Sequence, residues 1–304
     1  MDIYFLDNGR GKTIKGRAFV AQEPKVNIVF LTGMCEHATR YGQLGKFLNE
    51  KGISLYVQDA PGQGLNIDKE SGKGPQEWES NDFDDTVDFA FQKIEELKKD
   101  TSLPTGIMGH SMGSFVVQRY LERHPGTVSF VGLISSNGPC LAKMKISFAL
   151  ASLIVNKRNW DKPSHFIQSM GLGAYSRAIK GAKTPLDWLS CNEENVKAYA
   201  EDPLCGIRNT NGFWKEFLRG MSHLYEKKEL RKISRDEKIL LLAGEGDPVG
   251  EFGKGVYRLR DMYRRLGIKE IKCLVYPDMR HEIINERDNR KVYEEIAEWA
   301  LRSL

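Results

Sequence analysis

Short apolar runs alternate with longer amphipathic stretches along most of the chain, and this alternation limits the folds open to it. The first pair is Val26–Leu31, typical of a buried strand, and Tyr41–Lys51, whose apolar residues recur at helical spacing. Further strands are expected at 53–57, 104–109, 130–134, 238–243 and 271–276, and further helices at 82–99, 111–123, 256–266 and 291–304. The first twenty residues predict a strand pair. We therefore expect an α/β fold with a mostly parallel central sheet flanked by helices on both faces.

The alternation stops between Pro139 and Ser222. This stretch is helix-like and contains three of the five tryptophans, Trp160, Trp188 and Trp214. Its length is unusual for a connection between neighbouring strands, so we interpret it as a helical cap, or lid, rather than as an ordinary pair of crossover helices. The predicted organisation is one domain built from residues 1–138 and 223–304 and interrupted by a cap insertion at 139–222.

Composition excludes several classes of protein. Among 304 residues, 45 are Lys or Arg and 41 are Asp or Glu, and a net charge of +4 does not favour a nucleic-acid partner. No stretch approaches the roughly 20 apolar residues that a membrane helix needs. The most lipophilic run, Ile146–Val155, is half that length. It is compatible with lining an acyl pocket, with transient contact at a membrane surface, and with plain packing of the insertion onto the sheet.

The cysteines and the first residues indicate a reducing compartment. The five cysteines are Cys35, Cys140, Cys191, Cys205 and Cys273. Their number is odd and none form a C-x-x-C pair, so the spacing predicts neither a disulfide framework nor a zinc site. The start of the chain shows no apolar run followed by a small-residue cleavage site. We expect a cytoplasmic protein that uses no metal or organic cofactor.

The strongest chemical signal is Gly109-His110-Ser111-Met112-Gly113, which matches G-x-S-x-G. This motif places a serine in a sharp turn between a strand and a helix, and the glycines are needed because side chains there would clash. The context fits, because a strand is expected to end at Gly109 and a helix to begin at Ser111. Ser111 is therefore the candidate nucleophile, in preference to a solvated serine in an ordinary glycine-rich turn.

A serine nucleophile needs a base, and three histidines lie well downstream, His165, His223 and His281. The first two fall within the insertion or at its end. His281 follows the last predicted strand, where a loop can bring it above Ser111. We predict His281 as the base.

The base needs a carboxylate to orient it, and this acid is expected in the loop after the strand at 238–243. Asp247 is the natural choice, although Asp before proline is also a common turn residue. Glu245 and Asp278 are competing acids. Glu282 is the immediate sequence neighbour of His281 and should point elsewhere.

The reaction also needs donors for the developing oxyanion. One is the backbone N–H of Met112, directly after the serine, and the other is expected from Met34 in the turn after the first buried strand. Gly33 would allow a close backbone approach. His37 and Arg40 are expected to pair with Glu36 or to brace this turn rather than to act in catalysis.

Four segments together resemble a known family. They are Gly33–Tyr41, Gly109–Gly113, Gly246–Val249 and Arg280–Glu282 followed by Asn285-Glu286. In this order they resemble the monoacylglycerol lipase and lysophospholipase branch of the α/β-hydrolases, often labelled serine aminopeptidase-like. The resemblance implies an α/β-hydrolase fold with Ser111, Asp247 and His281 as triad and Met34 and Met112 as oxyanion donors. The chain departs from the family at Thr32, where the family has histidine, and in the turn 59–64, which lacks the usual histidine and arginine.

The resulting hypothesis is a serine hydrolase that cleaves carboxylic esters of lipophilic acyl groups, of the monoacylglycerol or lysophospholipid type, through an acyl-enzyme. The expected partner is a lipid-like small-molecule ester. Two alternatives stay open at this point. One is an aminopeptidase or amidase on the same triad, and the other is a non-catalytic ligand receptor on the hydrolase scaffold.

Overall fold

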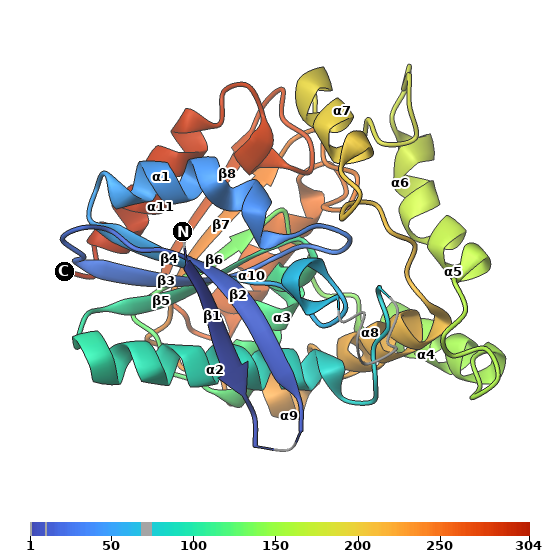
Figure 1. Ribbon diagram of the computed structural model, residues 1–304, viewed down its shortest axis with the longest axis horizontal. Coiled ribbons are helices and arrows are strands. Elements are labelled where there is room, and N and C mark those ends of the chain that lie inside the picture. The colour runs from blue at the N-terminus through green and yellow to red at the C-terminus, as the bar shows by residue number, and fades with distance from the viewer. Residues whose placement is uncertain (1, 10, 68–74) are drawn as a thin grey trace.

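The computed structural model describes residues 2–9, 11–67 and 75–304, and within them one eight-stranded sheet runs through the molecule (Figure 1). The strands are β1 (Asp2–Asp7), β2 (Thr13–Phe19), β3 (Val26–Leu31), β4 (Ile53–Gln58), β5 (Thr105–His110), β6 (Val131–Ile134), β7 (Lys238–Gly244) and β8 (Glu270–Tyr276). Their order across the sheet is β1-β2-β4-β3-β5-β6-β7-β8. All strands expected from the sequence are present.

The sheet is mostly parallel, as predicted. β1 and β2 pair antiparallel, as do β2 and β4, and every other neighbouring pair from β4 to β8 is parallel. Every residue of β3, β4, β5 and β6 is buried, which explains why these strands contain no charged Asp, Glu, Lys or Arg. Leu31 at the end of β3 pairs with Gly109 of β5, so the loops that follow these two strands leave the same edge of the sheet.

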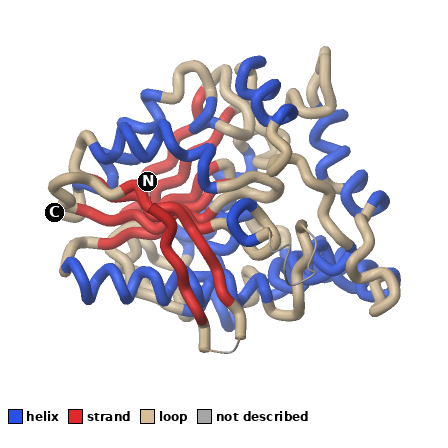
Figure 2. Tube along the Cα trace, in the orientation of Figure 1, coloured by secondary structure: helices blue, strands red, loops and turns tan. Residues whose placement is uncertain are grey.

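Helices cover both faces of the sheet, as Figure 2 shows in blue around the red strands. The elements outside the insertion are α1 (Gly42–Asn49), α2 (Asp82–Thr101), α3 (Met112–Arg123), α9 (Lys227–Leu230), α10 (Lys254–Arg265) and α11 (Arg290–Leu301), with short 3₁₀ turns η1 (Ala38–Tyr41), η2 (Gly64–Asn66) and η3 (Ile283–Asn285). One buried core joins α1 and α11 to the sheet, and a second core joins α2, α3 and α10 to the opposite face. These arrangements confirm the predicted α/β architecture.

Five helices separate β6 from α9 in the chain. They are α4 (Leu141–Ile154), α5 (His165–Met170), α6 (Leu172–Ala178), α7 (Glu193–Glu201) and α8 (Asn211–His223). In Figure 1 they gather at one side of the sheet, with α4 beside α8. We call residues 139–222 the helical segment. Within the described part of the chain, no helix has both the length and the apolar character to cross a bilayer.

Candidate active site

Ser111 lies outside both β5 and α3, in the sharp turn that joins them. Its φ is 52° and its ψ is −117°, a strained conformation for a residue with a side chain. A Cβ atom on Gly109 would lie 2.4 Å from the carbonyl carbon of Gly113, and one on Gly113 would lie 2.2 Å from the carbonyl oxygen of Leu31. The turn therefore requires both glycines of the motif. The sequence predicted a helix beginning at Ser111, but the positive φ moves the first helical residue to Met112.

The structure brings the three predicted triad residues together. His281 follows β8, and its Nε2 lies 2.8 Å from Ser111 Oγ. Its Nδ1 lies 3.0 Å from each carboxylate oxygen of Asp247, which follows β7. Asp247 is fully buried and its Oδ1 also accepts the N–H of Val249 at 2.9 Å, so the carboxylate is held facing the imidazole. A proton on Nδ1 would leave Nε2 free to accept the serine proton.

The competing residues lie elsewhere. Glu245 and Asp278 are both exposed, whereas Asp247 is buried against His281. His165 is exposed and contacts Arg208 at 3.0 Å, and its place in α5 is within the helical segment. Burial of the carboxylate–imidazole contact therefore separates Asp247 from the other acids.

The turn after β3 presents the other predicted oxyanion donor. The N–H of Gly33 donates to Glu36 Oε1 at 2.6 Å, and the N–H of Cys35 donates to Gln63 Oε1 at 2.7 Å. Met34 lies between these two fixed peptides, and Met112 is the buried first residue of α3. Both residues lie in segments that follow the carboxyl ends of the neighbouring strands β3 and β5. The N–H groups of Met34 and Met112 are therefore candidate oxyanion donors.

Glu36 is the centre of a buried polar cluster beneath this turn. Besides the N–H of Gly33, its Oε1 accepts the hydroxyl of Tyr41 at 2.8 Å and lies 2.8 Å from His110 Nδ1. Its Oε2 accepts from Arg40 at 2.9 Å, which is one of the pairings expected from the sequence. Burial opposes ionisation of Glu36, but His110 and Arg40 outweigh it and hold its pKa well below the usual range.

His110 connects this cluster to the candidate base. Its Nε2 lies 3.2 Å from the carbonyl oxygen of His281, which also accepts from Ser135 Oγ at 2.5 Å. A carboxylate and a carbonyl can only accept hydrogen bonds, so both ring nitrogens of His110 must donate, as they do in an imidazolium. Burial lowers the pKa of His110, but the Glu36 carboxylate more than offsets this and the net shift is upward.

Glu282 points away from the triad, as expected, and pairs with Arg40. Two guanidinium nitrogens donate to its two oxygens at 2.6 Å each, a bidentate pair. Asn195 of α7 donates to Glu282 Oε2 at 2.7 Å and accepts from Arg40 at 3.1 Å. This buried cluster therefore joins the turn after β3, the loop of His281 and the helical segment.

The helical segment also contacts His281 directly. The ring of Trp188 packs on the His281 ring with centroids 5.1 Å apart, and Tyr175 packs on Trp188 at 5.4 Å. The N–H of Glu282 donates to the carbonyl of Leu189 at 2.7 Å. These contacts place an apolar wall next to the base.

Sequence reasoning assigned no role to His110 or Trp188. A signal existed for His110, because it ends β5 and must lie beside the turn after β3, which contains Glu36. No local pattern points to Trp188, since its partner His281 lies far along the chain and the contact arises only in the folded protein.

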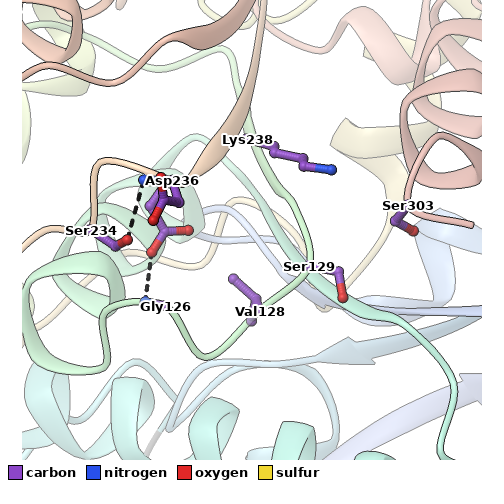
Figure 3. Close-up of a pocket in the computed structure, with 8 residues that line it drawn as sticks. Gly126, Val128, Ser129, Ser234, Asp236, Lys238 and Ser303 are labelled. Atoms are coloured by element: carbon purple, nitrogen blue, oxygen red, sulfur yellow. Dashed lines mark hydrogen bonds between the residues drawn. The ribbon is translucent and has the colours of Figure 1, made fainter.

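A cavity of about 410 Å³ lies at the amino-terminal edge of the parallel strands, opposite to the edge where Ser111 lies. Figure 3 shows the residues that line it. Its lining residues precede β6 and β7, begin β7 or follow α11, as Ser129, Lys238 and Ser303 do. The carboxylate of Glu237 accepts the N–H of Gly126 at 2.7 Å. Ligands of open α/β sheets bind at the carboxyl ends of the strands, so this cavity is separate from the Ser111 site.

Comparison with known proteins finds relatives that match most of this chain. The chain is 24% identical over 282 residues to the monoacylglycerol lipase of Mycolicibacterium smegmatis, covering 93% of this chain and 90% of that protein. It is 25% identical over 241 residues to the human monoglyceride lipase, covering 79% and 70%. The structure of a thermostable carboxyl esterase from Bacillus coagulans, with glycerol, superposes with a TM-score of 0.86 at 24% identity over 98% of both chains.

The fold and the family are both established by these findings. The eight-stranded, mostly parallel sheet with flanking helices is the α/β-hydrolase fold. Residues 22–288 match the model of the family described as serine aminopeptidase, S33. Since that match spans most of the chain, the protein belongs to the serine aminopeptidase S33 family.

Proposed function

We propose that this protein hydrolyses carboxylic esters of lipophilic acyl groups, of the monoacylglycerol or lysophospholipid type. The observation that carries the proposal is the contact of His281 with Ser111 Oγ at 2.8 Å on one side and with Asp247 at 3.0 Å on the other. Relatives named monoacylglycerol lipase and monoglyceride lipase support an ester in preference to an amide.

In the proposed reaction, His281 Nε2 takes the proton of Ser111 as Oγ attacks the ester carbonyl carbon. Asp247 holds the imidazole orientation and stabilises the imidazolium. The N–H groups of Met34 and Met112 stabilise the oxyanion, each lowering the barrier by about 3 kcal/mol. Collapse of the tetrahedral species breaks the ester C–O bond, and His281 gives its proton to the leaving alcohol.

The second half repeats the first with water. His281 takes a proton from water as its oxygen attacks the acyl-enzyme carbonyl. When this second tetrahedral species collapses, the bond to Ser111 Oγ breaks and the proton returns to the serine. The products are a carboxylic acid and free enzyme, and no metal or organic cofactor takes part in any step.

We further propose that the helical segment 139–222 is a cap and that residues 1–138 and 223–304 form the catalytic domain. An apolar cluster supports the role of the segment as a cap over the site, because it combines Trp188, Leu189 and Tyr199 of the segment with Val249, two residues from Asp247. Partly buried Leu172 and Tyr175 extend the cluster. Such a wall suits an acyl chain better than a charged peptide amine.

The outer face of α4 supports transient contact with a lipid surface. Ala151 and Val155 of the lipophilic run are buried, whereas Ile146, Leu150 and Leu153 are 62%, 52% and 84% exposed. The run therefore packs on one side and presents apolar side chains on the other. Co-sedimentation with phosphatidylcholine vesicles should weaken when exposed leucines are replaced by serine, and unchanged binding would contradict this contact.

The enzymatic proposal is tested with Ser111→Ala. We expect hydrolysis of a short p-nitrophenyl ester and of a monoacylglycerol to fall by about a millionfold, while the melting temperature stays near that of the parent. Ser303→Ala at the far end of the sheet is the matched control and should retain full activity. A Ser111→Ala variant that hydrolyses esters at the parent rate would contradict the assignment of Ser111 as the nucleophile.

Two readouts separate this proposal from the alternatives. A fluorophosphonate probe should label the folded parent at Ser111, and failure to label it would favour a ligand receptor. Faster turnover of an amino-acid amide than of a monoacylglycerol would favour an amidase on the same residues.

A further inference from the structure

His37, Asp202 and Cys205 bring three different metal-ligand atoms together at the junction between the turn after β3 and the helical segment. His37 precedes η1, Asp202 directly follows α7, and Cys205 lies in the same loop. Their donor atoms all lie within 4.8 Å of one another, and His37 Nε2 is 2.9 Å from Asp202 Oδ2. His37 and Cys205 are buried, whereas the Asp202 side chain is 30% exposed and leaves a route for an ion.

Bonds that do not use these donor atoms hold the three residues in place. The N–H of Cys205 donates to the carbonyl of Asp202 at 3.0 Å, and the N–H of Arg40 donates to the carbonyl of His37 at 3.2 Å. The N–H of Gly206 and the hydroxyl of Tyr199 donate to the carbonyl of Cys35 at 2.9 and 2.8 Å. Asp202 Oδ1 accepts the N–H of Leu204 at 2.8 Å, so Oδ2 is the oxygen that faces His37. The cluster is therefore positioned by the fold before any ligand arrives.

We propose that His37, Asp202 and Cys205 form a binding site for a thiophilic divalent cation of the Zn²⁺ class. Imidazole nitrogen, thiolate sulfur and carboxylate oxygen are the donors that zinc takes in tetrahedral sites. Tetrahedral coordination places such donors about 3.3–3.6 Å apart, so a small closure of the present cluster would suffice. Water would supply the fourth position.

Binding of the cation would change the protonation of Cys205 and the pairing of His37 with Asp202. The cation replaces the thiol proton of Cys205 and separates the His37–Asp202 contact, so each ion bound releases a proton. Burial raises the pKa of the Cys205 thiol, while nearby Arg40 acts in the opposite direction. The metal thus compensates the charge of a thiolate that the buried site otherwise disfavours.

The site would link two regions that the candidate chemistry uses. His37 lies three residues after Met34, and Asp202 and Cys205 belong to the helical segment. A bound cation would fix that segment to the turn that presents the Met34 N–H. The spacing of the cysteines gave no sign of a zinc site, because one ligand lies far from the other two in the sequence.

The first test uses Co²⁺ as a spectroscopic substitute for Zn²⁺ on chelator-treated, intact protein. We expect one ion per chain and a near-ultraviolet thiolate-to-cobalt charge-transfer band. Cys205→Ser should lose the band, whereas Cys191→Ser, which removes an exposed cysteine, should keep it. A band that survives in Cys205→Ser, or no binding by the parent, would overturn the proposal.

Asp202→Asn gives a second test that does not alter the buried thiol. Isothermal titration with Zn²⁺ should show at least a tenfold weaker Kd, with melting curves recorded to show that the variant is folded. An unchanged Kd would contradict the assignment. Neither test uses a substrate, and an ion bound instead at His281 would give no thiolate band, so both results are independent of the proposed esterase activity.

Discussion

The sheet domain and parts of the helical segment differ in how completely they bury their residues. In β3 to β6 every residue is buried between two helical layers. By contrast, α5 and α6 contain no buried residue, and α4 buries only Ala151. Within the helical segment, α8 joins the core of the sheet domain through buried side chains that include Phe213, Phe217 and Met221. Trp160 Nε1 adds a hydrogen bond to the carbonyl of Trp78 at 2.8 Å.

This difference indicates which region must be accurately positioned for the candidate active site to form. Ser111, His281 and Asp247 are placed by loops that leave the rigid edge of the sheet, so their geometry depends on the fully packed core. The helical segment contributes Trp188 and Asn195 at the site. Its helices α4, α5 and α6 leave most of their side chains exposed or only partly buried. We expect substitutions in the two regions to differ in size and in kind.

The largest effect is expected at Asp247, within the precisely placed part. Asp247→Asn should lower turnover of a short ester by about 10⁴-fold, because the imidazole loses its orienting carboxylate. Asp278→Asn, in the exposed loop of the same edge, should leave turnover unchanged. Steady-state kinetics on both variants decides the matter, and an Asp247→Asn enzyme within tenfold of the parent would remove Asp247 from the proposed triad.

The next effect concerns stability. Glu282→Ala leaves Arg40 with one fewer buried partner, and we expect the free energy of unfolding to fall by about 3–5 kcal/mol. Glu298 pairs with Arg302 at 3.0 Å on the exposed face of α11, so Glu298→Ala should cost less than about 1 kcal/mol. Urea unfolding measures both, and equal losses would show that burial of the first pair does not matter.

A pair of leucines compares the two regions directly. Leu133 in β6 is fully buried and Leu153 in α4 is 84% exposed. Leu133→Ala should cost about 2–5 kcal/mol in the free energy of unfolding, and Leu153→Ala should stay within about 0.5 kcal/mol. A comparable loss at Leu153 would mean that another surface covers α4 in solution.

The smallest effect is a pH dependence from His110, whose folded pKa is raised. A raised folded pKa makes the charged form stabilising below the ordinary value near 6.5, and this contribution is lost as pH rises through the folded pKa. The difference in unfolding free energy between the parent and His110→Gln should therefore be constant below about pH 6 and shrink at higher pH. Glu36 and Glu282 face this network and stay ionised over the range, because their pKa values are lowered.

Urea unfolding at several pH values measures that difference. His223→Gln is the control, because the His223 side chain is 45% exposed and has only a 3.9 Å contact with Glu226. A difference for His110→Gln that did not change with pH would show that the ring is neutral in the folded protein.

The sequence was sufficient to predict the sheet, and the three candidate triad residues that it indicated lie together in the structure. The alternation of apolar runs indicates β3 to β8, and the glycines around Ser111 are required by close backbone contacts. Asp247 and His281 follow from the order of strands, because the loops after parallel strands meet at one edge. These inferences needed no knowledge of distant contacts.

The remaining features depend on contacts between distant segments. Trp188 on His281 and His37 beside Asp202 are pairs that no local spacing encodes. The helical content of residues 139–222 was expected, but the short α5 and α6 have no repeating apolar face that would predict their packing. The direction of Arg40 was open between Glu36 and a bracing role, and the structure shows that it serves both Glu36 and Glu282.

The Arg40–Glu282 pair also bears on the synthesis of the protein. These residues are 242 positions apart, so Arg40 leaves the ribosome well before Glu282. Chains grow from the amino terminus and fold by regions as they emerge. A chain that stops before β8 contains Ser111 but lacks both His281 and Glu282, the partner of Arg40. Translation products that stop before β8 should therefore be inactive toward esters, and activity should appear only once the loop that contains His281 has been made and has folded.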